Sequence, residues 1–257
     1  MFQIDLTGKT VLITGASSGI GLGAAKMFAK AGANVSGCGL EKNGNEFIKT
    51  VQEQGAQALY ITCDVTNREE LGKLVQHTIE KFNSIDILIS NAGGNMFEGA
   101  ENCDDEHWQQ NINLNLASHW QLAKLCKPYL EQYHGVIIIM TSNHAFSTMS
   151  GCFPYNITKT ALTGLVRSLA IEWGPSIRTV GLAPGFIDTP GNQQWFNSFP
   201  DPAKERAKTI NQHLVKRIGT PEEVGAWCVF LASDHAAFAS GTTYLLDGGR
   251  SSLMQDS

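Results

Sequence analysis

Two residues that can move a proton stand one helical turn apart in residues 153–159, which read FPYNITK. On a helix, Tyr155 and Lys159 would share one face, so the ammonium group could approach the phenol or a molecule bound beside it. A free phenol has a pKa of about 10, and a nearby cation lowers it toward the range of a useful general acid or base. A partly buried tyrosine and a solvated lysine are also common in helices, so the pair needs support from other parts of the chain.

A glycine-rich turn, TGASSGIG at 14–21, leaves the first apolar run and enters a helical stretch. Gly15 permits the tight bend, Gly19 lets the backbone approach a phosphate, and Gly21 lets the helix pack against the strand. Free N–H groups at the helix start would face the anion. With a strand before it and a helix after it, the turn favours a dinucleotide site over a purely structural turn, with candidate contacts at Gly15, Ser17, Ser18, Gly19, Ile20 and Gly21.

Short apolar runs alternate with longer amphipathic stretches along the whole chain. Strands are expected at 10–14, 34–38, 58–62, 85–89, 136–140, 178–182 and 243–247, and helices at 20–31, 42–54, 67–82, 105–132, 154–173 and 221–233. Nearly all-apolar strands that alternate with helices are typical of a parallel sheet covered on both faces. We therefore expect one α/β domain over residues 1–257.

Signals for helix ends support these positions, with one exception. Gly32 is expected to stop the first helix, Thr66 and Thr220 to precede later helices, and Pro221 to occupy a first turn. Residues 189–216 fit no ordinary connection, because their first part is irregular and rich in proline, asparagine and aromatic residues. Long excursions from a domain often cover binding sites, so we expect a substrate lid here, with a mobile surface loop as the alternative.

The amino-acid composition excludes several classes of binding partner. The net charge of −5 and the pI near 5.8, with scattered basic residues, argue against nucleic acid or an anionic membrane surface as the main partner. Neither a membrane-spanning run nor a secretion signal is evident, so a cytoplasmic location is expected. The six cysteines lack the spacing of a disulfide framework or a zinc site, and we predict no metal.

Five motifs occur in order along the chain: TGASSGIG at 14–21, NAG at 91–93, Ser142, the YxxxK pair, and PG at 184–185. Together they resemble the short-chain dehydrogenase/reductase family in its shorter, single-domain branch, and the likeness runs from the first strand to LDGG at 246–249. The resemblance implies a Rossmann-type doubly wound sheet of about seven parallel strands, with a nicotinamide cofactor across the carboxyl ends of the strands. It also implies a homotetramer and a small-molecule substrate.

Carried over to this chain, the family pattern assigns four catalytic residues. Tyr155 would exchange the proton of the substrate hydroxyl, and Ser142 would hydrogen-bond the same oxygen. Lys159 would hold the nicotinamide ribose and lower the phenol pKa by its charge. Asn115, within NINLNL, matches a helical asparagine that kinks its helix and links Lys159 through water to solvent. A plain packing role is the alternative for Asn115, and its neighbours Asn111 and Asn113 receive no role.

The same pattern places further cofactor contacts after other strands. Asp64 and Val65 match the pair that holds the adenine ring, although Asp64 could instead only cap the following turn. The remaining candidates would contact the ribose, pyrophosphate and nicotinamide amide: Asn91, Ala92, Gly93, Pro184, Gly185, Ile187 and Thr189.

The choice between NAD and NADP depends on the end of the second strand. Gly39 stands where an NAD-specific aspartate is usual, and Leu40 where an NADP-specific arginine is common. Ser18 replaces the basic residue that often binds the 2′-phosphate. With no fixed cation there and with Glu41 adjacent, NAD is favoured, and Lys42 is the main argument against.

Substrate residues are expected from the segments that flank the catalytic motifs. Asn95, Asn143 and His144 favour a polar substrate with hydroxyl groups, such as a sugar or polyol, although a lone histidine is more often a packing residue. Phe153, Phe186 and Trp195 would suit the face of a ring or an alkyl chain.

Two other functions remain open. A 3-ketoacyl-carrier-protein reductase has the same motifs, but it normally uses NADPH and meets an acidic carrier through basic residues. A non-catalytic dinucleotide sensor on the same fold would usually lack the Tyr155 or Lys159 counterpart, and both are intact here.

Overall fold

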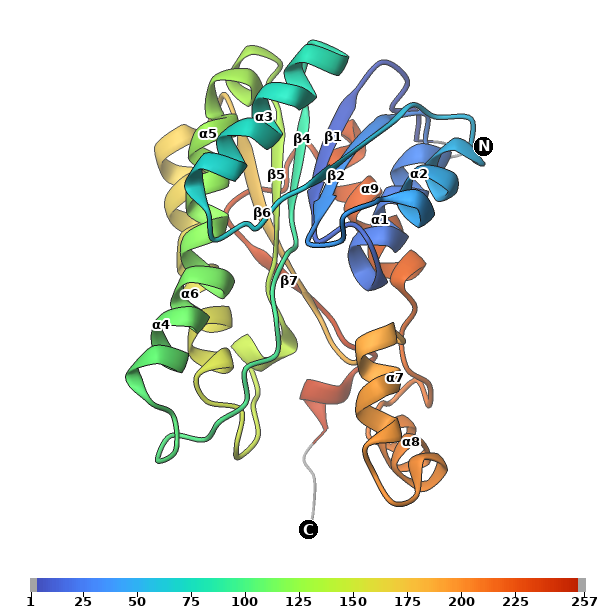
Figure 1. The fold of residues 1–257 in the computed structure, drawn as a ribbon, viewed down its shortest axis with the longest axis vertical. Coiled ribbons are helices and arrows are strands. Elements are labelled where there is room, and N and C mark those ends of the chain that lie inside the picture. The colour runs from blue at the N-terminus through green and yellow to red at the C-terminus, as the bar shows by residue number, and fades with distance from the viewer. Residues whose placement is uncertain (1–3, 254–257) are drawn as a thin grey trace.

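Seven parallel strands form one twisted sheet at the centre of the computed structural model, which describes residues 4–253 (Figure 1). In space the strands run in the order β3-β2-β1-β4-β5-β6-β7. Their bounds are β1 Thr10–Thr14, β2 Asn34–Gly39, β3 Ala58–Thr62, β4 Ile87–Ser90, β5 Val136–Met140, β6 Arg178–Pro184 and β7 Thr243–Leu246. The predicted α/β class and doubly wound topology are confirmed.

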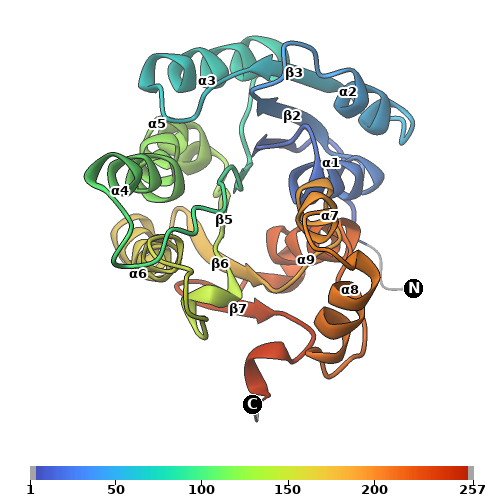
Figure 2. The same ribbon diagram turned by 60° about the horizontal axis from the view of Figure 1, so that its bottom comes forward.

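Helices cover both faces of this sheet (Figure 2). One face packs against α1 (Gly19–Lys30), α2 (Asn45–Gln52) and α9 (Pro221–Ala232), and the other against α3 (Arg68–Phe82), α5 (Ser118–Gln132) and α6 (Tyr155–Trp173). Successive strand residues point into the two hydrophobic cores in turn: Val11 and Ile13 of β1 pack in the core on the α1 side of the sheet, and Leu12 packs in the core on the α3 side. Burial on both faces explains why the strands read as continuous apolar runs.

The predicted single helix over 105–132 is interrupted. It consists of α4 (Asp105–Ile112), a π-helical turn over Asn113–Ala117, and α5. The π turn contains the buried Asn115, and such turns are rare and frequent at functional sites. The apolar pattern continues through the interruption, so periodicity alone did not reveal it.

The segment 189–216 is more regular than expected, since it contains two helices, α7 (Pro190–Asn197) and α8 (Pro202–Asn211). Thr189 and Asp201 cap these helices, and a proline occupies each first turn. Expecting an irregular excursion was therefore wrong, because each proline starts a helix and does not break one. Similarly, the side chain of Asn67, and not Thr66, caps α3.

The chain order reverses between β1 and β4, where connections leave the sheet in opposite directions. In open parallel sheets, ligands bind outside the carboxyl ends of the strands at such a point. At this edge, α7 and α8 lie on one side, and α4 and the start of α6 on the other (Figure 1). None of the described helices has the length and apolar character needed to cross a membrane.

Candidate active site

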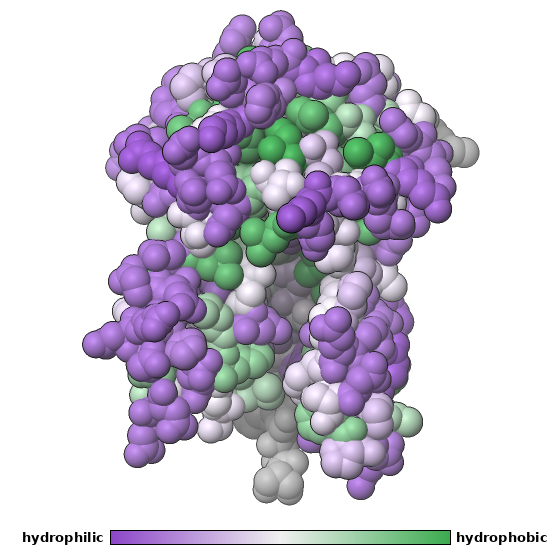
Figure 3. Space-filling view, in the orientation of Figure 1, coloured by the Kyte–Doolittle hydropathy of each residue, from purple (hydrophilic) through white to green (hydrophobic). Residues whose placement is uncertain are grey.

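A cavity of about 1330 Å³ opens at the carboxyl edge of the sheet. In Figure 3 the molecule is hollowed between the part that carries α4 and α6 and the part that carries α7 and α8, with apolar residues along one wall. The cavity extends from the glycine-rich turn after β1 to Ser142 and Tyr155 and on to α7. One continuous space therefore contains both the candidate phosphate turn and the candidate proton-transfer residues.

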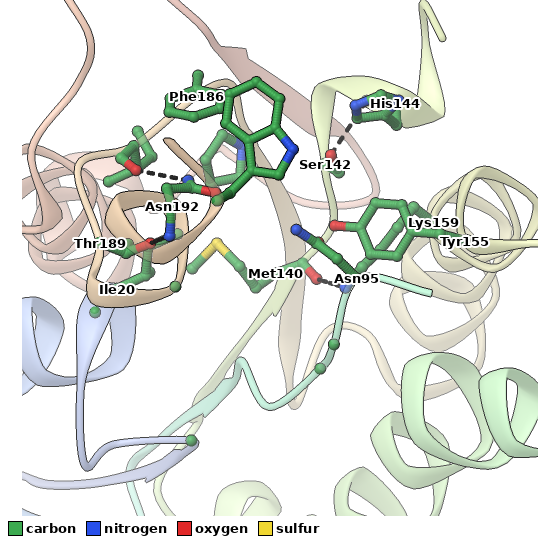
Figure 4. Close-up of a pocket in the computed structure, with 18 of the residues that line it drawn as sticks. Ile20, Asn95, Met140, Ser142, His144, Tyr155, Lys159, Phe186, Thr189 and Asn192 are labelled. Carbon is green, nitrogen blue, oxygen red and sulfur yellow. Dashed lines mark hydrogen bonds between the residues drawn. The ribbon is translucent and has the colours of Figure 1, made fainter. Parts of the chain in front are cut away.

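Tyr155 and Lys159 occupy the first turns of α6 and face the cavity (Figure 4). Their exposed fractions are only 9% and 3%, and the Lys159 Nζ lies 5.5 Å from the centre of the Tyr155 ring. The same Nζ donates a hydrogen bond of 3.2 Å to the carbonyl oxygen of Met140, the last residue of β5. The predicted pairing on one helical face is confirmed, and the hydrogen bond to the end of β5 holds the lysine side chain in place.

Ser142 follows β5 and stands beside the phenol. Its Oγ accepts a hydrogen bond of 3.2 Å from the backbone N–H of His144 and so caps the short 3₁₀ helix that spans Asn143–Ala145. This cap fixes the hydroxyl at the rim of the cavity, on the same side as Tyr155 (Figure 4). An oxygen atom of a bound molecule could thus meet both hydroxyl groups.

Burial sets the acid–base properties of this group. Desolvation raises the pKa of Tyr155 to about 12, while the hydrogen bond from Ser142 acts in the lowering direction. Burial also lowers the pKa of Lys159 to about 8. The expected lowering of the phenol pKa by Lys159 is therefore not found, because burial raises the Tyr155 pKa by more than the Ser142 hydrogen bond lowers it.

Asn115 holds the loop that follows β4. Its Oδ1 accepts from the N–H of Gly94 at 3.0 Å, and its Nδ2 donates to the Gly94 carbonyl at 3.0 Å and to the Oδ1 of Asn111 at 2.8 Å. A Cβ at Gly93 would lie 2.7 Å from the Asn115 Oδ1 and 3.3 Å from the Lys159 Nζ. Glycine at position 93 thus lets the loop, the π turn and the lysine meet.

Asn111, which received no role from the sequence, belongs to this network. It is fully buried, and its Nδ2 donates to the carbonyl oxygen of Pro154 at 3.0 Å, while its Oδ1 accepts from Thr158. Asn111 therefore connects the π turn to the residue before Tyr155. Its spacing of four from Asn115 was the available signal, since both side chains fall on one helical face.

The turn after β1 has the shape expected for binding an anion. Gly15 and Gly19 have φ angles of +62° and +52°, which favour glycine, and a Cβ at Gly21 would collide with the carbonyl oxygen of Gly15. Ser18 precedes α1 without a side-chain cap, so the first N–H groups of the helix stay available. Asn91 donates to the carbonyl oxygens of Thr14 and Gly15 and braces the turn from β4.

The predicted cofactor residues all line this cavity: Gly15, Ser17, Ser18, Gly19, Ile20, Gly21, Leu40, Asp64, Val65, Asn91, Ala92, Gly93, Pro184, Gly185, Ile187 and Thr189. Asp64 also uses one carboxylate oxygen to accept from the N–H and hydroxyl of Thr66, so it caps the following turn as well. Uncapped N–H groups, room left by glycine, and a cavity that reaches Lys159 fit a dinucleotide bound across β1 and β4.

The predicted substrate residues are brought together except for one. Asn95, Asn143, His144, Phe186 and Trp195 line the cavity, whereas Phe153 does not. The Phe153 ring stacks on Trp108 with centroids 5.5 Å apart and so packs against α4. Phe97 lines the cavity instead of Phe153, and its ring lies edge-to-face on Tyr155 with the centroids 5.3 Å apart. An aromatic residue after the NAG motif was the only sequence signal for Phe97.

His144 stands close to the candidate catalytic group. Its ring lies 5.9 Å from those of Tyr155 and Phe97, and its Nδ1 shares a hydrogen bond of 2.9 Å with the Thr148 hydroxyl. Burial, and then the charge of Arg250, lower its pKa, so the imidazole is neutral near pH 7. A neutral imidazole can donate or accept a hydrogen bond toward a bound hydroxyl group.

Comparison with known proteins gives a consistent relationship. The family model described as "Enoyl-(Acyl carrier protein) reductase" matches residues 15–251. Human "Dehydrogenase/reductase SDR family member 4" is 33% identical over 97% of this chain and 90% of the relative. Rabbit (Oryctolagus cuniculus) "L-fucose dehydrogenase" is 34% identical over 94% of this chain and 84% of the relative.

The solved structure of Thermoplasma acidophilum aldohexose dehydrogenase superimposes with a TM-score of 0.91 at 30% identity, over 100% of this chain and 99% of the other. The sequence matches and this superposition each span nearly the whole chain. The chain therefore belongs to the short-chain dehydrogenase/reductase family, whose members oxidise or reduce CH–OH and carbonyl groups with NAD(H) or NADP(H).

Proposed function

We propose that this protein is an NAD(H)-linked oxidoreductase that interconverts a secondary alcohol and a ketone on a substrate rich in hydroxyl groups, such as a sugar or polyol. One observation carries the proposal: Tyr155, Ser142 and Lys159 meet in a single cavity with an uncapped, glycine-lined helix start. That combination provides proton transfer and dinucleotide binding within reach of one substrate.

The chemistry assigns one task to each side chain. When bound, NAD⁺ supplies the hydride acceptor and a positively charged ring. In oxidation, Tyr155 as phenolate takes the hydroxyl proton while the carbon loses hydride, and in reduction the phenol returns that proton. Ser142 donates a hydrogen bond to the same substrate oxygen, and its hydrogen bond to Tyr155 favours the phenolate form. The Lys159 ammonium would hold the nicotinamide ribose. These roles also fit the buried Asn115 and Asn111, which hold the surrounding backbone.

Support for NAD comes from Glu41, which folds back over the end of β2. A Cβ at Gly39 would lie 2.6 Å from the Glu41 Oε2 and 2.8 Å from the Ser17 Oγ. The Ser17 hydrogen bond lowers the Glu41 pKa, so the carboxylate is charged at neutral pH. This carboxylate can accept from ribose hydroxyls and repels a 2′-phosphate, as an aspartate at position 39 would.

The substrate class rests on the polar groups near Tyr155. Asn95, Asn143 and His144 offer donors and acceptors around the reacting oxygen, and Phe186 and Trp195 offer flat apolar surfaces. Aromatic faces combined with hydrogen-bonding side chains suit a ring that carries hydroxyl groups. Two relatives carry names of this kind, L-fucose dehydrogenase and aldohexose dehydrogenase.

Two further features complete the proposal. Helices α7 and α8 form the substrate lid, since Phe186, Trp195 and Phe199 reach from this side into the cavity. A homotetramer rests on the family resemblance.

Reduction of a 3-ketoacyl group on a carrier protein is the second candidate, because a Thermotoga maritima relative that is 32% identical over 95% of this chain is named "3-oxoacyl-[acyl-carrier-protein] reductase FabG". The negative charge of Glu41 and the net charge of −5 favour NAD and oppose an acidic carrier. A non-catalytic sensor is the third candidate, and the intact Tyr155 and Lys159 argue against it.

A spectrophotometric screen at 340 nm tests the proposal. The purified protein is mixed with NAD or NADP and with sugars, polyols, cyclic alcohols or short secondary alcohols, and reduced nicotinamide is measured. We expect reduction of NAD with a sugar or polyol. Tight NADH binding without turnover of any alcohol, or of the corresponding ketones, would favour the sensor. Activity confined to NADPH and acyl thioesters would favour the carrier-protein reductase.

Cofactor selection gives a sharper prediction. Leu40 is 72% exposed at the rim of the cavity, so Leu40→Arg places a cation where a 2′-phosphate would lie. We expect the ratio of kcat/KM for NADP to that for NAD to rise about tenfold, since one charge-assisted hydrogen bond is gained. An unchanged ratio would mean that the adenosine end of the site has been misassigned.

A further inference from the structure

Arg250 is a charged residue of the substrate end that the sequence motifs did not identify. It begins the 3₁₀ helix Arg250–Ser252 after β7, and it lines the same cavity as Ser142 and Tyr155. Within residues 4–253, no carboxylate lies within salt-bridge distance of its guanidinium. Its side-chain hydrogen bond in this part of the chain goes to the Met149 Sδ at 3.9 Å, and a thioether is a weak acceptor.

The position of Arg250 relates it to the reacting groups. Met149 belongs to the connection between the 3₁₀ helix after Ser142 and the start of α6, so the contact joins the two chain segments across the cavity rim. The charge of Arg250 also acts on His144, whose ring stands 5.9 Å from Tyr155. Arg250 therefore reaches toward the side of the cavity where Tyr155, Ser142 and His144 meet.

The charge balance around Arg250 indicates what it can bind. Asp247 is 7% exposed, and its two oxygens accept from the N–H groups of Gly249 at 2.9 Å and Ser251 at 2.7 Å. Its negative charge acts on Arg250 without occupying the guanidinium hydrogens. The local charge is thus offset, while several guanidinium donors have no acceptor among residues 4–253, an arrangement that does not need an anionic ligand.

Neutral oxygen acceptors on a ring fit the surrounding surfaces. The Phe97 ring packs against Tyr155, and the Phe186 and Trp195 ring centroids lie 5.6 Å apart, so flat apolar surfaces line the same cavity as Arg250. Such surfaces bind the C–H faces of a ring, and a planar guanidinium can donate two parallel hydrogen bonds to adjacent hydroxyl groups.

We infer that Arg250 is a specificity-determining residue that donates hydrogen bonds to hydroxyl groups of a neutral polyhydroxylated substrate, beyond the carbon that reacts at Tyr155. The inference rests on the proposed function and narrows its substrate class: it assigns recognition to the C-terminal 3₁₀ helix. Arg250 touches no reacting atom in this account, so its loss is expected to affect binding of hydroxyl-rich substrates and not the chemical step.

The test compares Arg250→Met and Arg250→Lys with the wild type on three kinds of alcohol. The neutral hydroxylated probes are L-fucose, D-glucose and myo-inositol, the probe without further hydroxyl groups is cyclohexanol, and the anionic probe is D-gluconate. For the best neutral hydroxylated probe, Arg250→Met should lower kcat/KM about 10- to 100-fold, mainly through KM, as expected for loss of a hydrogen bond from a charged donor. Arg250→Lys should recover part of the loss, and cyclohexanol oxidation should change less than about threefold.

Arg167→Met is the matched control, because Arg167 is exposed on α6 and, among the described residues, its side chain bonds only to Thr163 one turn earlier. Circular dichroism and NADH binding verify that each variant is folded. Equal losses on the best neutral hydroxylated probe and on cyclohexanol would overturn the inference, as would a wild type that prefers D-gluconate and loses that preference in Arg250→Met. Failure of the wild type to transfer hydride to or from any probe or its ketone would instead overturn the proposed function.

Discussion

The two ends of the cavity are built in different ways. The cofactor end consists mainly of backbone: glycines with positive φ angles, uncapped N–H groups at the start of α1, and the braced loop after β4. The substrate end consists of side chains from distant segments, such as Met149 and Arg250, which meet although 101 positions separate them. The first end is therefore determined by a short continuous motif, whereas the second depends on how several segments pack together.

The largest effect is expected where backbone geometry alone determines the cofactor end. In Gly21→Ala the new Cβ collides with the Gly15 carbonyl, so the turn cannot close and NADH binding should be lost. Gly72→Ala is the matched control: nothing lies within 4 Å of its Cβ position in α3. That exchange should leave NADH binding unchanged and stabilise the protein by about 1 kcal/mol. Retained NADH fluorescence enhancement in Gly21→Ala would contradict the description of the turn.

Ser142→Ala acts at the junction of the two ends. Loss of one hydrogen bond to the reacting oxygen should lower kcat about 100-fold while NADH affinity is retained. Ser142 also favours ionised Tyr155, so its removal raises the Tyr155 pKa further. Oxidation needs the phenolate, and the rising limb of its pH profile should therefore move to higher pH. A pH profile of oxidation with a lower maximum but an unshifted rising limb would show that Ser142 does not influence the Tyr155 pKa.

A smaller effect is expected on the stability of the fold, through the buried His119. His119 is buried, its Nδ1 shares a hydrogen bond of 2.7 Å with the Ser90 hydroxyl, and burial lowers its pKa from 6.5 to about 3. Between pH 6.5 and 3 the His119 imidazole is therefore protonated in the unfolded chain but neutral in the folded protein. The free energy of unfolding consequently falls as the pH drops from 6.5 toward 3. In His119→Asn this slope should be shallower in urea titrations between pH 7 and 4. Equal slopes would show that another group controls acid stability.

The sequence predicted the sheet, its helices and the cofactor end because each depends on local patterns. Apolar runs marked the strands, and the glycines of 14–21 could be interpreted one by one. The Tyr155 and Lys159 pair also depended on local helical spacing, and the structure confirms it.

The substrate end could not be predicted to the same degree. Phe153 and Phe97 are both aromatic and both near motifs, but only packing against Trp108 determines that Phe153 turns away. Arg250 lacks a local pattern, since its importance comes from a cavity wall formed by another segment. Even the phenol pKa was misjudged, because burial cannot be derived from the spacing of Tyr155 and Lys159.

The two ends of the cavity meet at Tyr155, and the variant Tyr155→Phe tests the proposed mechanism most directly. The variant removes one hydroxyl group and keeps the ring that packs against Phe97. Stopped-flow absorbance at 340 nm measures hydride transfer, and NADH fluorescence measures cofactor binding in the same samples. The account predicts loss of turnover by at least about 1000-fold with nearly unchanged NADH affinity. Substantial turnover in Tyr155→Phe would contradict the assignment of Tyr155 as the acid and base of this site.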